Sequence, residues 1–565
     1  MRLSASEPAR EPDLTARALA CGLLVGVLLC IANLYMGLKT GFWDGGQITA
    51  SVLAFALASG RLTRLENNVA QTAACAVGGV PAAAGLLGAI PALQLLGVRV
   101  PAWGVAVWGL ALGIIGVLIA LALRRRLLEE EDLPFPTGVA AAEVIEVLHA
   151  GGEAGRGRGR WVLAGGAAAA VVAWFRSGKP AIVPESLAVP GRLAGVPLAS
   201  LGIALSTSPL LWGVGIVVGP RIAAGLLTGS VLGWIALGPW LVRGPLHLAA
   251  DRAAIASWLS WPATALMAGA ALVALLRQAA LISGALRDLR SAAAGRSRAR
   301  LGGALLAAAA AIATVVAGKA LFDLRPLHTA LALVLSVVGA SLCARSAGLT
   351  DLSPLGTVGQ VTQAVYGGLA PGQPAVNVAA GSVVAGAATQ TSVLLWSLRV
   401  GRLLRAPVGG QVAAALAGCV VGALVCMPAY GILLRAYGLT SPDLPMPTAL
   451  QWKAMGELVA QGLTALPPGA LQAVIVSGIA GVALAVAEET RAGRFVPPAV
   501  AVGIGALVPF DYSLTIACGA ALAAVGRRRW PQLRSELAGV AGAGLIAGDS
   551  LIGVAVALLR SFGLL

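Results

Sequence analysis

Long apolar runs separated by short polar segments form the dominant pattern of this chain, from Leu14 to the C-terminus. Most runs approach the roughly 20 residues that an α-helix needs to cross the hydrocarbon core of a bilayer. The pattern therefore predicts an all-α, polytopic bundle of transmembrane helices. The clearest runs lie near 14–36, 46–60, 102–123, 160–175, 198–218, 221–242, 257–280, 303–320 and 328–346.

Polar residues interrupt several runs. A glycine-broken segment extends from Asn33 to Thr49. Glu66, Asn67 and Gln71 have the spacing of one helix face. Irregular backbone at membrane depth is tolerated only where it is buried in protein or lines a cavity, so we expect re-entrant or broken helices that meet around one chamber. The expected breaks lie around 33–49, 66–72, 134–149, 350–363, 377–391 and 445–457.

The segment 133–149 concentrates this polar pattern. It reads Leu-Pro-Phe-Pro-Thr-Gly before a helix, and Thr137 is positioned to cap that helix. Glu143, Glu146 and His149 follow at intervals of three and form one polar stripe. The segment is too short for a full crossing. We therefore expect a re-entrant or tilted half-helix.

The same segment returns 311 residues later. Leu133-Pro-Phe-Pro-Thr137 is matched by Leu444-Pro-Met-Pro-Thr448, and Glu146 falls on Glu457 at the same offset. Together with further matches in the same order, this predicts a duplication that produced two homologous halves. The further matches pair Gly37-Leu38 with Gly348-Leu349, Asn68-Val-Ala with Asn377-Val-Ala, and Gly225 to Gly229 with Gly544 to Gly548.

The duplication divides the chain into four expected parts. They are a cytoplasmic tail (1–13), a first transmembrane repeat (14–286), a basic cytoplasmic linker (287–302) and a second transmembrane repeat (303–565). Counting passes from a cytoplasmic N-terminus, with basic clusters kept inside, makes the repeats inverted; one extra crossing would make them parallel. The expected location is a bacterial-type inner (plasma) membrane.

Composition supports the membrane assignment. Hydrophobic residues make up 58% of the chain and charged residues 11%, against roughly 25% charged in soluble domains. The net charge of +16 lies in short clusters between apolar runs, which is the positive-inside pattern. No basic stretch has the length or interleaved aromatics of a nucleic-acid site. The seven cysteines lie singly, so we expect neither a metal site nor a cofactor.

Several polar motifs, taken in order, resemble the oligopeptide transporter family, which includes yellow-stripe-like carriers of metal chelates. The resemblance covers nearly the whole chain. It implies about 16 transmembrane helices and proton-coupled symport of short peptides or of metal complexes with peptide-like chelators. Gln360 stands where the family pattern has Lys, and Ser397 where it often has Asp. The resembling segments are Asn33 to Gly41, Asn67 to Thr72, Leu133 to Gly138, Thr350 to Gly356, Thr362-Gln363, Pro371 to Asn377 and Phe495 to Pro509.

Four carboxylates, Glu66, Glu143, Glu146 and Glu457, are candidates for proton coupling. Ionisable side chains inside a membrane are costly and usually mark a pathway or a partner, and burial raises a carboxyl pKa. For Glu66 the alternative is an acid favoured by the helix dipole at an N-terminus. For Glu143, Glu146 and His149 it is a hydrated helix end in the headgroup region.

Neutral donors and acceptors form the expected substrate site, because they suit a peptide backbone. Tyr35 and Lys39 also suit a substrate carboxylate. Each amide has the alternative of an interhelical hydrogen bond, and Lys39 has that of reaching the membrane interface. The candidates are Asn33, Tyr35, Lys39, Asn67, Asn68, Gln71, Thr137, Gln363, Asn377 and Gln390.

These patterns together predict a secondary active transporter that works by alternating access, with protons, a small substrate and the lipid bilayer as its partners. One alternative is an intramembrane enzyme that uses Glu143, Glu146 and His149 as acid and base. Another is a polar-lined channel. The chain has no H-E-x-x-H, G-x-S-x-G or P-loop motif, so we expect no enzymatic activity. The sequence leaves the oligomeric state open.

Overall fold

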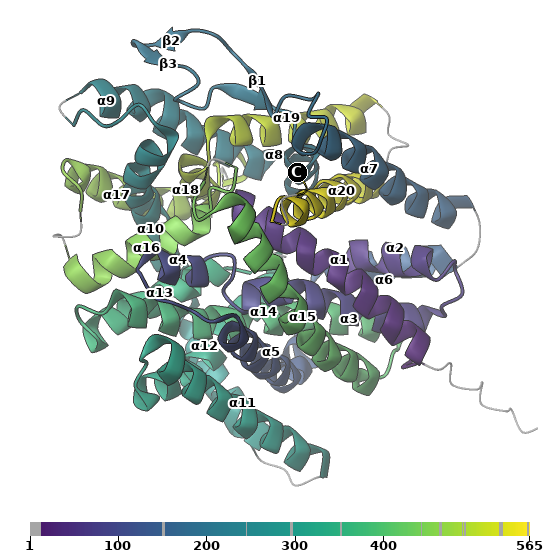
Figure 1. The fold of residues 1–565 in the computed structure, drawn as a ribbon. Coiled ribbons are helices and arrows are strands. Elements are labelled where there is room, and N and C mark those ends of the chain that lie inside the picture. The colour runs from purple at the N-terminus through teal and green to yellow at the C-terminus, as the bar shows by residue number, and fades with distance from the viewer. Residues whose placement is uncertain are drawn as a thin grey trace, which may run out of the picture.

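Helices account for nearly all regular structure in the computed structural model of this protein (Figure 1). The polytopic helical bundle predicted from the apolar runs is confirmed. The structure describes residues 13–149, 153–244, 246–293, 298–350, 353–441, 443–462, 466–488, 490, 493–529, 535–561 and 564.

The described helices follow one another with short connections. Up to residue 293 they are α1 (Ala16–Thr40), α2 (Gln47–Leu57), α3 (Arg64–Ala83), α4 (Ala89–Leu95), α5 (Ala102–Arg124), α6 (Pro136–His149), α7 (Glu153–Ser177), α8 (Pro209–Ser230), α9 (Gly238–Arg243) and α10 (Arg252–Ala293). After it they are α11 (Arg298–Phe322), α12 (Pro326–Thr350), α13 (Leu355–Leu369), α14 (Pro374–Leu404), α15 (Val408–Tyr437), α16 (Pro447–Gln461), α17 (Ala470–Glu488), α18 (Ala499–Leu507), α19 (Phe510–Arg529) and α20 (Ser535–Ser561). Single π-helical segments, Arg125–Glu130 and Val231–Leu237, extend α5 and α8, and a 3₁₀ turn covers Gly493–Phe495.

Four short strands lie in the connection between α7 and α8, at the top of Figure 1. β1 (Ser186–Ala188) pairs antiparallel with β4 (Ala204–Ser206), and β2 (Arg192–Leu193) pairs antiparallel with β3 (Val196–Pro197). They fold this connection over one end of the helical bundle.

Nine helical segments of the described chain have the length and apolarity of a membrane span. Other helices, such as α3 with 20 residues and α7 with 25, reach spanning length but are more polar. The total of about 16 spans stays a prediction. The nine segments are Ala16–Thr40, Ala102–Glu130, Pro209–Arg243, Gly302–Phe322, Pro326–Gly348, Pro374–Leu404, Val408–Tyr437, Ala470–Glu488 and Ala541–Arg560.

Local sequence explains where several helices begin and end. Pro136 and Pro447 occupy the first position of α6 and α16, where the missing N–H would have no helical partner. Thr63 and Glu66 form a capping box at the start of α3. α1 ends at Gly41, whose φ of +79° is a left-handed conformation that glycine adopts without steric cost.

Two of the expected breaks are wrong, because the segments 66–72 and 377–391 lie inside the continuous helices α3 and α14. Some of their polar side chains, such as Gln71 and Gln390, bond to the neighbouring helix, which lets a continuous helix accommodate them. Irregular backbone lies instead at 41–46, 131–135 and 443–446, immediately before α2, α6 and α16.

α14 lies at the centre of the bundle, and the whole of its apolar window is buried. α6 packs on its C-terminal part, where Gly138 contacts Trp396 and Arg399. α16 packs on its N-terminal part, where Gly456 contacts Val378. Roughly 18 helical residues separate the two contacts, or about 27 Å at 1.5 Å per residue. α6 and α16 therefore lie near opposite ends of one long helix.

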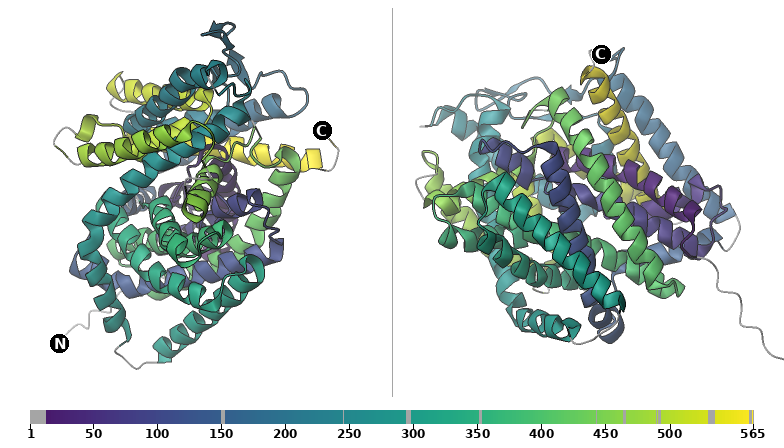
Figure 2. Two further views of the ribbon diagram at one scale, coloured as in Figure 1. Left: turned by 90° about the vertical axis from the view of Figure 1, so that its left-hand side faces the viewer. Right: turned by 60° about the horizontal axis from the view of Figure 1, so that its bottom comes forward.

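α11 lies at the edge of the bundle, where it packs on α5 and α12 (Figure 1). In the left view of Figure 2, α10 and α11 approach each other at the same edge. α10 ends at Ala293 and α11 begins at Arg298, so both helices extend into the predicted linker 287–302. Of the predicted tail, 1–13, only Asp13 lies among the described residues.

Candidate functional site

Lys39 lies inside the bundle near the end of α1, with only 8% of its surface exposed. Its ammonium donates to the Tyr35 hydroxyl at 3.5 Å. The same nitrogen lies 5.4 Å from the centre of the Tyr35 ring and 5.7 Å from that of Tyr512. Aromatic faces stabilise a cation electrostatically. Within the described chain Lys39 forms no ion pair, so its remaining donors are available to an anionic ligand.

A buried ion pair adjoins Lys39. Arg176 of α7 lies 3.0 Å from Asp549 of α20, and the charge of Asp549 also interacts with that of Lys39. The second carboxylate oxygen of Asp549 accepts hydrogen bonds from the Ser208 hydroxyl at 2.6 Å and the Leu210 N–H at 2.9 Å. A buried charge is tolerated when it is paired and hydrogen-bonded. This network joins α7, α20 and the start of α8.

Asp511, at the start of α19, links these groups to a cavity. It is buried, and its Oδ2 lies 3.9 Å from the Arg252 guanidinium. The charge of Lys39 also acts on Asp511. Its Oδ1 has no hydrogen-bond partner among the residues that the structure describes. Lys39, Arg176, Asp511 and Asp549 are hereafter the ionic cluster.

The cavity encloses about 290 Å³ between α10, α16 and the segment before α16. That volume is at the low end of the roughly 300–1,000 Å³ of small-molecule sites. Arg252 lines it, as do Lys453 and Glu457, which form an ion pair at 2.7 Å. Trp234 and Trp261 supply aromatic walls. Glu457, a predicted proton-coupling residue, therefore faces a cavity. Hydroxyl groups come from Ser257, Ser260, Thr440 and Ser441.

Two further carboxyl groups lie in the connections at this end of the bundle. Glu185, just before β1, hydrogen-bonds Asp443, just before α16. Burial raises the pKa of Glu185, and the neighbouring charge of Asp443 raises it further, although Lys39 and Arg176 act in the opposite direction. Two carboxyl groups that share a site hold a proton more readily than one alone.

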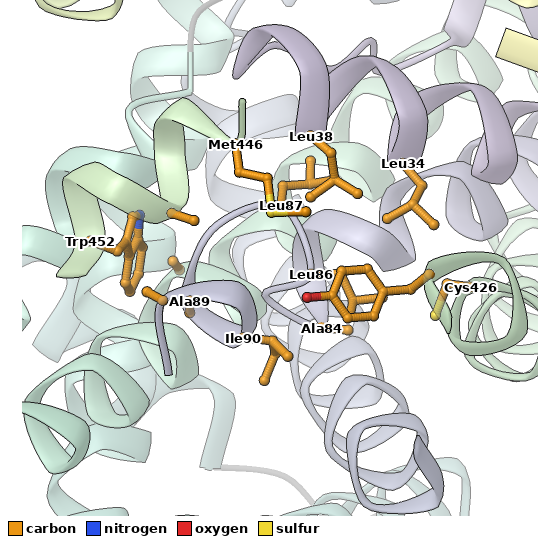
Figure 3. Close-up of a cluster of buried hydrophobic side chains, with 14 of the residues drawn as sticks. Leu34, Leu38, Ala84, Leu86, Leu87, Ala89, Ile90, Cys426, Met446 and Trp452 are labelled. Carbon is orange, nitrogen blue, oxygen red and sulfur yellow. The ribbon is translucent and has the colours of Figure 1, made fainter. Parts of the chain in front are cut away.

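Apolar side chains pack beside the ionic cluster. Leu34, Leu38, Leu87 and Met446 pack together, with Met446 pointing toward Leu38 and Leu87 (Figure 3). The Met446 N–H donates to the Leu38 carbonyl oxygen at 2.9 Å. The segment that leads into α16 is thereby attached to α1 one residue before Lys39.

Three predicted substrate-binding amides form hydrogen bonds within the protein. Gln71 Nε2 donates to Ser397 Oγ at 2.9 Å, and Gln390 Nε2 donates to the Ala76 carbonyl at 3.0 Å. Asn68 donates to Gln71 at 3.4 Å. The bonds of Gln71 and Gln390 are the interhelical hydrogen bonds that formed the alternative expectation for these residues. The bond of Asn68 lies within α3.

Three other predicted amides, Asn67, Gln363 and Asn377, are fully buried. Neither their nitrogen nor their oxygen has a hydrogen-bond partner in the described part of the chain. Gln363 lies beside α16, since a Cβ on Gly456 would stand 3.6 Å from its Oε1. A buried amide without partners carries a desolvation cost that a ligand or water removes. Thr137 is partly buried at the start of α6.

Asn33 holds the break after α1 in place. Its Nδ2 donates to the carbonyl oxygens of Asp44 at 2.8 Å and Gly78 at 2.9 Å, and its Oδ1 accepts from the Asp44 N–H at 3.1 Å. These bonds connect the irregular segment to α3. They use both N–H donors and one of the two acceptor lone pairs of the amide.

The other three predicted carboxylates lie away from the ionic cluster. Glu66 pairs with Arg17 at 2.7 Å, at the opposite end of α1 from Lys39, about 33 Å along the helix. Glu143 and Glu146 are exposed on α6, so the expectation that they are buried is wrong. They follow the outer face of α6, whose apolar face is the one that packs on the bundle.

Sequence reasoning missed Arg176, Asp511 and Asp549. A signal existed for Asp549 and Arg176. Asp549 is the one acidic residue in the apolar run 541–560, and Arg176 directly follows the run 161–175. An ionisable residue in such a run marks a functional candidate.

Comparison with known proteins assigns the family. The model of the OPT oligopeptide transporter protein family matches residues 13–560 of this chain. The chain belongs to the OPT oligopeptide transporter family. The resemblance found in the polar motifs is thereby confirmed. The family consists of transporters and not of enzymes, which removes the enzyme alternative.

Relatives of this OPT chain match it over most of their length. A putative oligopeptide transporter of Haemophilus influenzae is 26% identical and covers 93% of this chain and 92% of its own length. A putative oligopeptide transporter of Saccharomyces cerevisiae is 23% identical over 87% and 88%. A probable metal-nicotianamine transporter of Oryza sativa is 24% identical over 79% and 71%.

Proposed function

We propose that this OPT-family transporter is a secondary active carrier of short peptides or peptide-like metal chelates, driven by protons and working by alternating access. The ionic cluster beside the 290 Å³ cavity is the observation that supports this proposal most directly. It combines cations, carboxyl groups and enclosed space inside a membrane protein, where such groups are costly.

A substrate carboxylate is expected to bind at Lys39 and Arg252. Asp511 interacts electrostatically with both of these cations. An anionic ligand in the cavity is expected to compete with Asp511 for the Arg252 guanidinium. The tryptophan walls and the hydroxyl groups suit the apolar and polar parts of a small peptide or chelate.

Protons are expected to bind to carboxyl groups of the same region. Glu185 and Asp443 hydrogen-bond each other, and Glu457 lines the cavity beside Lys453. Protonation of one member relieves the repulsion between two carboxylates. Of the four carboxylates predicted for proton coupling, Glu457 is the one that we propose, because it lines the cavity.

Two inverted repeats are the proposed frame of the carrier. The backbone at Phe135 and Met446, 311 residues apart, has the same left-handed φ of +44° and +50°. Each precedes a short helix that begins with proline, and these helices contact α14 about 27 Å apart. That separation is close to the roughly 30 Å of a bilayer core, as inversion requires. Inverted repeats commonly underlie alternating access.

The proposed boundaries of the repeats are 14–286 and 303–565, with a cytoplasmic tail and a basic cytoplasmic linker at 1–13 and 287–302. The proposed location is a bacterial-type inner membrane with the N-terminus in the cytoplasm. The clusters of Arg and Lys between apolar runs support this orientation.

Uptake by reconstituted protein tests the carrier proposal. Proteoliposomes with an inward proton gradient are expected to accumulate labelled tripeptide or iron–nicotianamine, and Lys39→Gln is expected to abolish accumulation. Lys319→Gln is the matched control, because Lys319 is exposed on α11. Both variants are checked for the wild-type helical content and melting temperature. Wild-type uptake by a folded Lys39→Gln variant refutes the proposed site.

Counterflow separates a carrier from a channel. Vesicles preloaded with unlabelled substrate are expected to take up labelled substrate transiently against its gradient, because a carrier exchanges one bound molecule for another. Downhill equilibration without this overshoot contradicts alternating access. Accumulation that persists after the proton gradient is collapsed contradicts proton coupling.

A further inference from the structure

A second concavity lies on the outside of the bundle, away from the ionic cluster. It is a groove of about 280 Å³ between α5, α11 and α12. All of its lining is aliphatic, and Ala122 is exposed at its mouth. The residues that define it most clearly are Leu118 and Ala122 of α5, Ala307 and Ala311 of α11, and Val337 of α12.

The groove opens toward the lipid. Each of its three helices contains a candidate membrane span. On α11, Leu305, Ile312 and Val316 are each more than 60% exposed. Aliphatic side chains exposed to this extent on a spanning helix face acyl chains, because water does not reach them.

The groove exists because α5 and α11 are close at one end and apart at the other. Trp108 of α5 stacks edge to face on Phe322 of α11 with ring centres 5.0 Å apart. Gly104 packs directly against Leu321. Two to four helical turns further along α5, the lining residues of the two helices leave the groove between them. The helices run antiparallel, so the open end is the one at which α5 finishes and α11 starts.

The side chain of Arg125 supplies a cation at that open end. Arg125 follows Leu118 and Ala122 at intervals of seven and three, so it continues one side of the lining stripe. Its side chain is 78% exposed, and its Nε contacts Glu130 at 3.1 Å. The guanidinium has five N–H donors. In the described structure, one of its nitrogens makes the contact with Glu130. The other donors are available to a phosphate.

We propose that this groove binds one acyl chain of an anionic phospholipid, with the headgroup phosphate against Arg125. The lipid fills the space where α11 diverges from α5 and so fastens α11 to the bundle. A helix of a second protein is a poorer occupant, because the aliphatic lining offers no polar partner and the exposed cation at the open end matches a phosphate.

Lipid binding by purified, delipidated full-length protein tests this site without reference to transport. Phosphatidylglycerol and phosphatidylcholine with identical acyl chains are added, and bound lipid and melting temperature are measured. Phosphatidylglycerol is expected to raise the melting temperature and to remain bound. Ala122→Phe, which fills the groove, is expected to weaken this binding about tenfold. Arg125→Ala is expected to reduce phosphatidylglycerol binding to the level of phosphatidylcholine.

Ala309→Phe is the matched control, because Ala309 is exposed on the side of α11 opposite Ala307 and Ala311. Its lipid binding is expected to equal that of the wild type. If Ala122→Phe does not fold, Ala311→Phe fills the groove from the other wall. Wild-type binding by a folded, groove-filled variant overturns the proposal. Equal binding of the two lipids by the wild-type protein overturns the assignment of Arg125.

Discussion

The N–H of Met446 donates to the carbonyl oxygen of Leu38 at 2.9 Å, and this bond has a counterpart elsewhere in the protein. The N–H of Phe135, 311 residues earlier, donates to the carbonyl oxygen of Gly348, also at 2.9 Å. Each Pro-x-Pro segment is thus bonded to the end of a long helix, α1 or α12, from the other part of the chain. The attachment at Leu38 adjoins Lys39 of the ionic cluster, whereas the attachment at Gly348 lies beside α6, near the other end of α14.

The equivalent conformations of these segments predict that their central residues are exchangeable. Phe135→Met and Met446→Phe are each expected to lower the free energy of unfolding by less than about 1.5 kcal/mol, since buried volume is nearly conserved. Phe135→Ala and Met446→Ala are expected to cost about 2–5 kcal/mol. Denaturant titration in detergent measures both pairs. Equal losses for exchange and truncation would contradict the equivalence.

The Arg176–Asp549 pair is expected to make the two residues interdependent. Asp549→Asn keeps the oxygen that accepts from Ser208 but leaves Arg176 buried without a counter-charge. The expected cost is about 3–5 kcal/mol in the free energy of unfolding. Arg176→Met in the same chain is expected to restore most of it. A double-mutant cycle measures the coupling, and strictly additive effects would rule the pairing out.

Glu131 is expected to make stability depend on pH in the acid range. Partial burial raises its pKa, but hydrogen bonds and charges of Arg345 and Arg126 outweigh this, so the pKa lies below its usual value. A carboxyl with a lowered folded-state pKa contributes stability above its unfolded pKa of about 4.3, and that stability is lost as pH falls further. Glu131→Gln is expected to show a shallower fall in melting temperature between about pH 5 and pH 3. Parallel curves for wild type and variant would argue against the ion pair.

Asn33 and Asn377 are expected to respond differently to truncation, although both are buried amides. Asn33→Ala orphans backbone groups of Asp44 and Gly78, at about 1–3 kcal/mol per group, so the melting temperature is expected to fall. Asn377 bonds to no described residue, so Asn377→Ala is expected to leave the melting temperature nearly unchanged and to reduce uptake. Each variant is measured in both assays. A lower melting temperature for Asn377→Ala, with reduced uptake only for Asn33→Ala, would contradict these roles.

Close helix packing is expected to make Gly229 intolerant of alanine. A Cβ there would stand 1.8 Å from the carbonyl oxygen of Val502 in α18. Gly229→Ala therefore forces α8 and α18 apart, which is expected to cost about 1–3 kcal/mol or more. Gly431→Ala is the control, since nothing lies within 4 Å of a Cβ at that position of α15. It is expected to stabilise the protein by about 0.5–1 kcal/mol. Equal melting temperatures would contradict this packing.

The sequence alone predicted a polytopic helical membrane protein and its family, because both depend on properties read along the chain. The two runs expected near 198–218 and 221–242 form one candidate span, Pro209–Arg243. Apolar length predicts a span regardless of its neighbours. The two Pro-x-Pro-Thr segments begin short helices at Pro136 and Pro447, because proline restricts its own backbone locally. Thr137 is therefore the second residue of α6, and the expectation that it caps this helix is wrong. The position of Glu66 at a helix N-terminus, which was the alternative expected for it, is also a local property, because Thr63 three residues before it caps the helix.

Tertiary structure decided which polar side chains are available to a ligand. Gln71 and Asn67 are near neighbours on α3, yet one bonds to Ser397 of α14 and the other has no described partner. The partner of a buried polar group is supplied by another helix, often hundreds of residues away. Lys39 and Asp549 are one example, because only the packing of α1 against α20 brings their charges together. The polarity of each segment was thus determined by sequence alone, whereas the grouping of charges around a cavity depended on how the helices pack.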